Sequence, residues 1–67
     1  MGDALGNRLR EERARRDLTQ AELAEMVGVS RKTVNTVENG VFIPSTVLAL
    51  RLAKALGTTV EKLFHLK

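Results

Sequence analysis

Residues 20–37 constrain the fold most strongly, because they have the pattern of two short helices joined by a sharp turn. Ala24 puts a small side chain midway along the first segment, and Gly28, four residues later, permits the positive φ that reverses a chain. Val34 and Val37, three residues apart, give the second segment an apolar side. Two short helices that cross steeply need a small residue where they approach and a glycine between them. The spacing therefore predicts a helix-turn-helix motif over about residues 20–37.

Residues that cap helix N-termini precede the successive helical segments. Thr19 is followed at the third position by Glu22, which predicts a reciprocal capping box, while Ser30 and Ser45 precede later segments. Either Thr58 or Thr59 caps the last segment. These signals predict an all-α fold of five helices. The predicted helices span about Leu5–Arg16, 20–27, 31–38, Thr46–Leu56 and Val60–Leu66, with an extended linker over Val41–Pro44.

Apolar residues at helical spacing indicate which side of the outer helices is buried. Leu5 and Leu9 share one side of the first predicted helix, four residues apart. In the fourth helix, the residues at the expected core face are Leu48, Leu52, Ala55 and Leu56.

Length and composition exclude several classes of protein. The chain has 67 residues, which suffices for one small domain over residues 1–67. It has no Cys and one His, so disulfides, thiolate zinc sites and multi-histidine metal sites are excluded, and no cofactor is expected. The sequence shows neither a nucleophile–base set nor a glycine-rich phosphate loop, so it gives no indication of an enzyme. A domain this small needs a further source of stability, so we expect self-association through a region within residues 46–67.

The N-terminal residues and the net charge limit where the protein is expected to act and which partners it is expected to bind. The first residues lack the basic head and apolar run of a leader, and no stretch approaches about 18 apolar residues, so we expect a cytoplasmic protein. The 11 Lys and Arg residues against 8 Asp and Glu residues give a formal net charge of +3. A mildly basic chain permits a nucleic-acid partner without establishing one.

Several short segments carry a resemblance to a known family. The segments Thr19–Ala24, Gly28–Arg31 and Val34–Gly40 resemble the phage-repressor-like (Xre/Cro/cI) helix-turn-helix family, and the later segments Phe42–Ser45 and Val60–Phe64 resemble its short stand-alone members. The match covers about residues 7–64. It implies a five-helix, lambda-repressor-like DNA-binding domain, usually dimeric, whose third helix lies in the major groove.

The resemblance also implies roles for individual residues. The alternative is that these residues form an ordinary solvated surface. The implied base-reading residues are Arg31, Lys32, Thr33, Asn35 and Thr36. The implied phosphate contacts are Gln20, Ser30, Asn39, Phe42 and Ser45. Asn39 has the further alternative of ending its helix by tolerating a positive φ. Arg13 and Glu38 match an internal salt bridge of the family.

One position departs from the family pattern, because members commonly have an aliphatic residue where this chain has Glu12. We expect Glu12 to lie at the core margin, paired with Arg16 at i+4, or else the first helix to be slightly rotated. The other arginines of the first helix are expected to form a mixed solvated face rather than a second DNA surface.

The resemblance predicts a sequence-specific, DNA-binding transcriptional regulator. It would act as a repressor and bind a palindromic operator as a homodimer, associated with the nucleoid and without a small-molecule ligand. Candidate residues for the dimer interface are Leu50, Leu63, Phe64 and Leu66, of which Leu63 and Phe64 are alternatively core residues. The alternative function is a protein-interaction module, such as the antitoxin component of a two-protein complex, which an exposed apolar surface would indicate.

Overall fold

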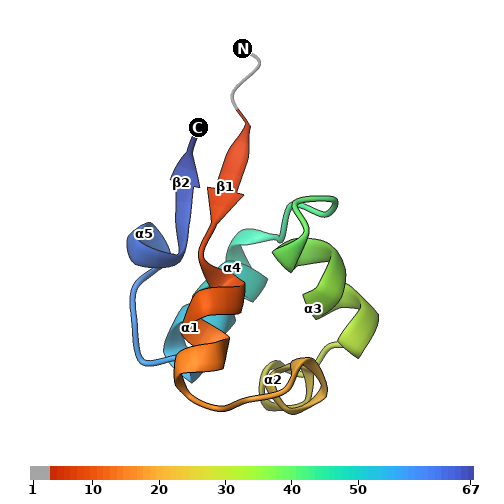
Figure 1. Cartoon of the computed structure of the whole chain (residues 1–67). Helices are drawn as coiled ribbons and strands as arrows, with labels where there is room; N and C mark the ends of the chain where they lie inside the picture. Colours follow the sequence, from red (N-terminus) through yellow and green to blue (C-terminus); the bar gives the residue numbers. More distant parts are fainter. Residues whose placement is uncertain (1–3) are drawn as a thin grey trace.

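The computed structural model describes residues 4–67, and these form five helices and a small two-stranded sheet (Figure 1). In chain order the elements are β1 (Leu5–Asn7), α1 (Leu9–Arg15), α2 (Gln20–Val27), α3 (Arg31–Glu38), α4 (Thr46–Ala55), α5 (Val60–Leu63) and β2 (Phe64–Leu66). The predicted helix-turn-helix is α2 and α3. The fold is therefore helical in the manner expected, but it is not strictly all-α.

The two strands replace the outer ends of two predicted helices. β1 pairs antiparallel with β2, with Gly6 opposite His65 and Asn7 opposite Phe64 (Figure 1). The prediction that the first helix begins at Leu5 is therefore wrong, as is the continuation of the last helix to residue 66. Gly6 and Asn7 are poor helix formers, and Oδ1 of Asn7 accepts a hydrogen bond from the Leu9 N–H at 3.0 Å. This bond satisfies the free N–H of the first residue of α1, at the point where the chain leaves the strand.

The N-terminal caps of α2 to α5 confirm the helix starts predicted for them. The Thr19 hydroxyl accepts from the Glu22 N–H at 3.0 Å, and the Glu22 carboxylate accepts from the Thr19 N–H at 2.8 Å. Ser30 and Ser45 cap α3 and α4 through the N–H groups of the third residue on, at 3.2 and 3.1 Å. Thr59, rather than Thr58, caps α5. Each cap satisfies a backbone donor that its helix leaves unpaired.

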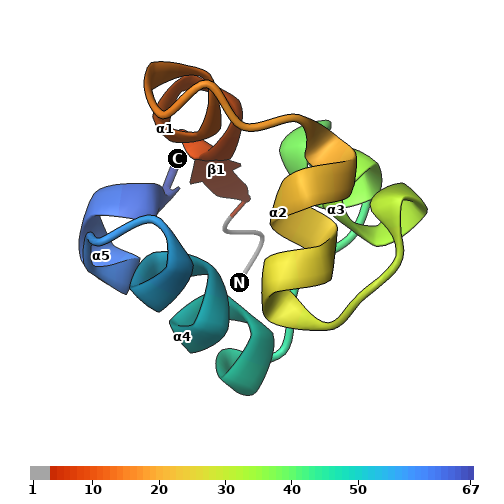
Figure 2. The same ribbon diagram turned by 90° about the horizontal axis from the view of Figure 1, so that it is seen from below.

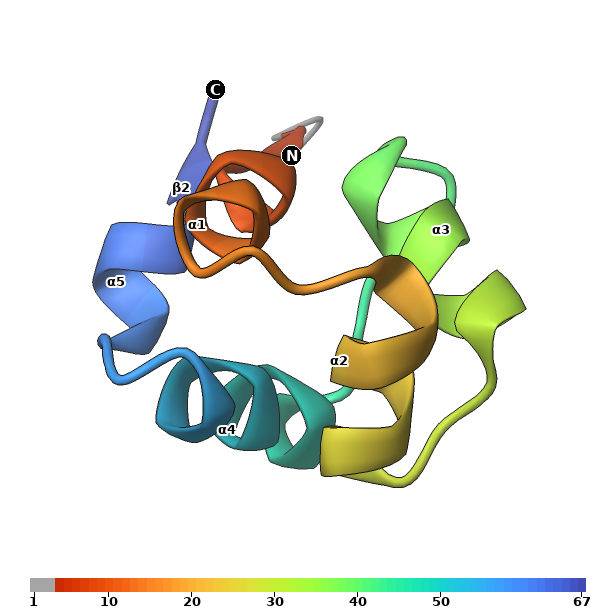
Figure 3. The same cartoon turned by 60° about the horizontal axis from the view of Figure 1, so that its bottom comes forward.

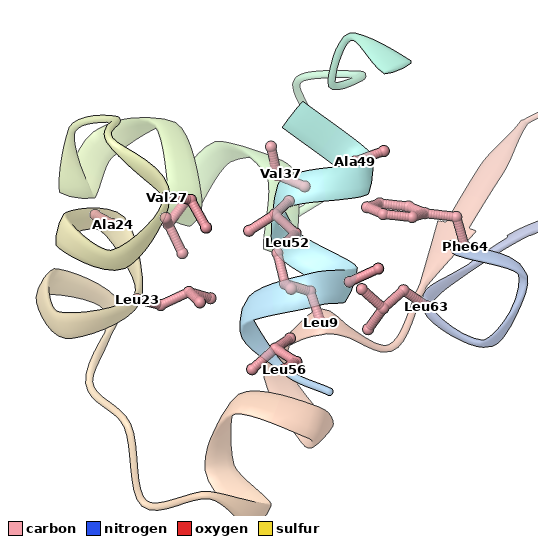
Figure 4. Close-up of a cluster of buried hydrophobic side chains, with 12 residues drawn as sticks. Leu9, Leu23, Ala24, Val27, Val37, Ala49, Leu52, Leu56, Leu63 and Phe64 are labelled. Atoms are coloured by element: carbon pink, nitrogen blue, oxygen red, sulfur yellow. The ribbon is translucent and has the colours of Figure 1, made fainter. Parts of the chain in front are cut away.

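The hydrophobic core lies among α1, α2, α4 and α5 and extends to one side of α3 (Figures 2 and 3). Figure 4 shows side chains of α2 facing those of α4, with Leu9 of α1 between α4 and Leu63 of α5. The largest fully buried side chains are Leu9, Leu23, Leu52, Leu56, Leu63, Val34 and Val37. α2 contacts both α3 and α4, so it fixes the helix-turn-helix on the remainder of the domain.

Two predicted core positions of α4 are corrected, and the alternative left open at Leu63 and Phe64 is resolved. The core face of α4 includes Ala49 and Ala53, whereas Leu48 and Ala55 are only partly buried. Ala49 and Ala53 are 8% and 4% exposed, and both belong to the core cluster. Leu63 and Phe64 are 0% and 9% exposed, so they are core residues.

At the margin of the core, Glu12 pairs with Arg16 at 2.9 Å and with Arg15 at 3.1 Å. The expectation of a marginal, paired Glu12 is confirmed. Within residues 4–67, no helix combines the length and the apolar character that crossing a membrane requires.

Candidate nucleic-acid interface

α3 presents one apolar side to the core and one polar side to the solvent. Val34 and Val37 are each 1% exposed and anchor the helix against α2. Arg31, Lys32 and Asn35 are exposed on the opposite side. The helix lies at the periphery of the molecule, next to α2 and away from α5 (Figure 2). Because both valines are fixed in the core, the orientation of the polar side is fixed as well.

A shallow hollow joins this polar side to the start of α2. It is lined by Gln20, Arg31, Lys32 and Asn35. Two of these side chains are cations and two are amides, so the hollow offers hydrogen-bond donors and positive charge. Sequence analysis predicted all four as DNA contacts, and the fold brings them together. Such a surface suits an anionic backbone beside the edges of bases.

Thr33 and Thr36 lie at the edge of this surface and are partly buried. The Thr36 hydroxyl donates to the carbonyl oxygen of Thr33 at 2.9 Å. The hydroxyls of Thr33 and Ser30 are 3.0 Å apart, and either can donate. These three hydroxyls are thus engaged within α3 and its cap, and they offer less to a ligand than the residues in the hollow do.

Glu38, at the end of α3, connects three helices through its carboxylate. Its side chain is 0% exposed, and Oε2 accepts from Nε of Arg13 on α1 at 2.6 Å. Nε2 of Gln20 on α2 donates to Oε1 at 3.1 Å. The predicted salt bridge between Arg13 and Glu38 is confirmed. Burial by itself raises the pKa of Glu38, but the hydrogen bonds from Arg13 and Gln20 outweigh it and bring the pKa below its usual value.

This carboxylate also orients one of the predicted phosphate contacts. A carboxylate only accepts hydrogen bonds, so the amide nitrogen of Gln20 must face Glu38. That nitrogen carries a second hydrogen, which is directed elsewhere. Gln20 is therefore held at the mouth of the hollow by a group that is itself anchored in the interior.

Sequence analysis missed the role of Arg10, which it assigned to a solvated face. Nη2 of Arg10 donates to Oδ1 of Asn39 at 2.8 Å, and Nε lies 3.5 Å from Oε1 of Glu38. Arg10 precedes Arg13 by three residues and so shares its side of α1. That spacing could have indicated the role of Arg10, because Arg13 was already matched to Glu38 and a residue on the same side of α1 comes close to the same carboxylate.

Asn39 and the loop after it lie beside the end of α3. Asn39 has a φ of −84°, and Gly40 takes the positive φ of 73° that ends the helix. Asn39 is the C-cap of α3, but the alternative that it ends the helix through a positive φ is wrong. The N–H groups of Val41 and Phe42 donate to the carbonyl oxygen of Thr36 at 2.9 and 3.1 Å, which folds the loop back onto α3.

Phe42 and Ser45, the remaining predicted phosphate contacts, are both exposed, and Ser45 caps α4. They lie outside the hollow. Within residues 4–67, no group of three or more His, Asp or Glu side chains is arranged to hold a metal ion.

Comparison with known proteins agrees with this geometry. The helix-turn-helix family model matches residues 9–63. An HTH-type transcriptional regulator of Bacillus subtilis, YgzD, is 43% identical over 61 residues, which cover 91% of this chain and 92% of that protein. The crystal structure of the restriction-modification controller protein C.AhdI from Aeromonas hydrophila superposes with a TM-score of 0.78 and 40% identity, covering 82% of this chain and 83% of that one. The DNA-binding domain of the P22 c2 repressor superposes with a TM-score of 0.77 and 33% identity, covering 81% of this chain and 71% of that one. The chain belongs to the helix-turn-helix family of DNA-binding transcriptional regulators, of the Xre/Cro/cI-like type.

Proposed function

We propose that the chain binds specific DNA sequences by placing α3 in the major groove. The observation that carries this proposal is the hollow shared by Gln20, Arg31, Lys32 and Asn35. The major groove admits one helix, and an arginine or lysine there pairs with O6 and N7 of guanine. Arg31 and Lys32 stand in the first turn of α3, where a recognition helix contacts base edges. Thr33, Asn35 and Thr36 complete the proposed reading surface.

The proposed phosphate contacts flank α3 on both sides. Gln20 starts α2, where unpaired N–H groups add to the affinity for an anion. Ser30 lies at the start of α3, and Asn39 at its end. Phe42 and Ser45 extend the contact along the loop toward α4. These groups would set the register of α3 on the duplex without reading its sequence.

A homodimer on a palindromic operator is the proposed assembly, through residues within 46–67. Among the earlier candidates, Leu50 and Leu66 remain exposed, at 56% and 69%. Val47 is 59% exposed and lies three residues before Leu50, so the two share an outer face of α4. Exposed leucine and valine side chains on one face favour burial against a second copy. Two copies would then meet half-sites about one helical turn apart.

Repression by occlusion of a promoter is the proposed outcome of binding. The relatives include a transcriptional regulator, YgzD, and the DNA-binding domain of a phage repressor. The proposed place of action is the cytoplasm, on the nucleoid.

Arg31→Ala tests the proposed reading surface. On a duplex recovered by selection from random sequence, we expect this variant to lose about 1–3 kcal/mol of binding and to relax the preference at one base pair. The matched control is Arg15→Ala, which removes the same charge from an exposed position of α1. Fluorescence anisotropy over a salt series measures both. Equal losses in the two variants would mean that Arg31 contributes only charge.

Leu50→Gln tests the proposed dimer. We expect sedimentation at micromolar concentration to shift toward the monomer, whereas Met26→Gln, at an exposed position of α2, leaves the distribution unchanged. An unaltered distribution for Leu50→Gln would remove α4 from the interface.

One observation favours the second candidate function, a module that binds a different protein. Val41 and Ile43, in the loop before α4, are 77% and 69% exposed and add to the apolar surface. Purification of the untagged native complex discriminates between the candidates. A stoichiometric partner protein in the absence of DNA affinity would favour the interaction module.

A further inference from the structure

A chain of hydrogen bonds connects α1 to the reading surface of α3. Nη2 of Arg10 donates to Oδ1 of Asn39 at 2.8 Å, and Nδ2 of Asn39 donates to Oδ1 of Asn35 at 3.2 Å. Asn35 lines the hollow with Gln20 and the two cations of α3. Arg10 is thus connected by hydrogen bonds, through the side-chain amide of Asn39, to Asn35, whose side chain faces the proposed DNA.

The chemistry of arginine determines the orientation of both amides. A guanidinium group only donates hydrogen bonds, so Asn39 must turn its oxygen toward Arg10. Its NH2 group then faces Asn35, which must turn its own oxygen toward Asn39. Asn39 lies four residues after Asn35, so this oxygen is directed along α3 rather than outward. Within residues 4–67, no hydrogen bond occupies Nδ2 of Asn35, and this NH2 group is left for a ligand.

Glu38 holds Arg10 in place. Its Oε1 lies 3.5 Å from Nε of Arg10, and its carboxylate is also bound by Arg13 and Gln20. The Arg10 side chain is 61% exposed, yet its guanidinium has acceptors on two sides, Glu38 and Asn39. The relay therefore begins at a buried carboxylate and ends at the solvent-facing side of α3.

We propose that Arg10, acting through Asn39, fixes Asn35 as a hydrogen-bond donor and so makes α3 favour guanine over adenine at the base pair that Asn35 reads. This inference rests on the proposed function. An asparagine that is free to rotate can pair with adenine through both of its groups, accepting from N6 and donating to N7. The Asn35 oxygen is turned along α3 toward Asn39, so the group that Asn35 presents to the groove is its NH2 donor. Guanine presents two acceptors, O6 and N7, whereas adenine presents a donor beside its acceptor.

The DNA experiment compares sequences selected from random duplexes by several variants. Asn35→Ala identifies the base pair concerned, because that position loses its preference. In Arg10→Met the relay is broken, and we expect the ratio of guanine to adenine at that position to fall by about tenfold, within the discrimination of one bidentate contact. Arg10→Lys retains a donor and keeps the ratio. The matched control, Arg15→Met, removes a charge from the same helix and leaves the ratio unchanged.

A second measurement tests the relay without DNA. In nuclear magnetic resonance spectra of the uniformly labelled chain, we expect Arg10→Met to shift the side-chain amide signals of both Asn39 and Asn35. Arg15→Met should shift neither. If the Asn35 signal does not respond to Arg10→Met, the relay does not exist and the proposal is overturned.

The outcomes separate this inference from the proposed function. A selected motif whose guanine-to-adenine ratio is the same in the native chain and in Arg10→Met overturns the relay and leaves sequence-specific binding intact. Adenine as the preferred base of the native chain also overturns it. Recovery of no motif refutes the proposed function, and the relay then has no role in specificity.

Discussion

Glu38→Gln removes the charge that connects α1, α2 and α3 while conserving the volume of the side chain. The native carboxylate is 0% exposed and accepts from Nε of Arg13 at 2.6 Å. Glutamine puts an NH2 group or a neutral oxygen at that place. The Arg13 side chain, 16% exposed, then loses its counter-charge.

The expected loss is large relative to the total stability. Breaking a buried ion pair by removing one partner costs about 3–5 kcal/mol. Arg13 keeps some exposure and a 2.7 Å hydrogen bond to the carbonyl oxygen of Leu18, so we expect about 2–4 kcal/mol for Glu38→Gln. At roughly 0.05–0.15 kcal/mol per residue, a domain of this size has only about 3–10 kcal/mol of stability in total. The variant is therefore expected to be partly unfolded at room temperature if the native value lies at the lower end.

Urea denaturation followed by circular dichroism measures the free energy of unfolding at one fixed chain concentration. The matched control is Glu11→Gln, an exposed carboxylate on α1, and we expect it to unfold at the native midpoint. A double-mutant cycle with Arg13→Met isolates the interaction of the two side chains. A loss below about 1 kcal/mol, or single losses that add without coupling, would show that the Arg13–Glu38 pair does not stabilise the fold.

The same carboxylate predicts how stability depends on pH. Burial raises the pKa of Glu38, but the hydrogen bonds from Arg13 and Gln20 lower it by more than burial raises it. The pKa in the folded state therefore lies below the pKa in the unfolded state. The contribution of Glu38 is then fully present above the unfolded pKa of about 4.3 and is lost as the pH falls through the folded pKa. We expect the difference in unfolding free energy between the native chain and Glu38→Gln to shrink below about pH 4. A difference that stays constant down to pH 3 would contradict this assignment.

Three substitutions at small residues test the remaining packing. Gly6→Ala places a Cβ against the ring of His65, an exposed side chain that can rotate away, so the loss of unfolding free energy in urea should stay below about 1 kcal/mol, and His65→Ala in the same chain should remove it. Ala24→Leu overfills a site that is 3% exposed where the helix-turn-helix packs; we expect a loss of about 1–3 kcal/mol of unfolding free energy, with weaker DNA binding measured by anisotropy. At Gly28 the φ is 76° and an added Cβ meets no atom within 4 Å. Gly28→Ala should therefore lose only about 1–2 kcal/mol of unfolding free energy, which is what a left-handed backbone costs a residue with a Cβ, measured by thermal unfolding.

The starts of α2 to α5 and the helix-turn-helix could be predicted from the sequence, because their causes are local. A cap needs only a Ser or Thr and the N–H groups of the next turn, as at Thr19 and Ser45. The turn at Gly28 needs only a residue that tolerates a positive φ. The match of Arg13 to Glu38 came instead from the resemblance to a family.

The sheet could not be predicted, because its causes are contacts between the two ends of the chain. Each strand has three residues, too few to show an alternating pattern. Phe64 follows Leu63 in a pattern that fits a continuing helix, but the chain becomes extended there and pairs with Asn7. For the same reason the core positions of Leu63 and Phe64 were left open between interior and interface. The acceptor that Arg10 finds on Asn39 also depends on how α1 packs against α3.

Selection from a pool of random duplexes measures whether α3 reads a DNA sequence. With the native chain at moderate salt, we expect a recurrent motif of two half-sites related by a dyad, about one helical turn apart. Arg31→Ala should recover the same motif with a relaxed preference at one position of each half-site. Recovery of duplexes with no common sequence would contradict this expectation, because the hollow at α3 would then bind DNA only through its charge.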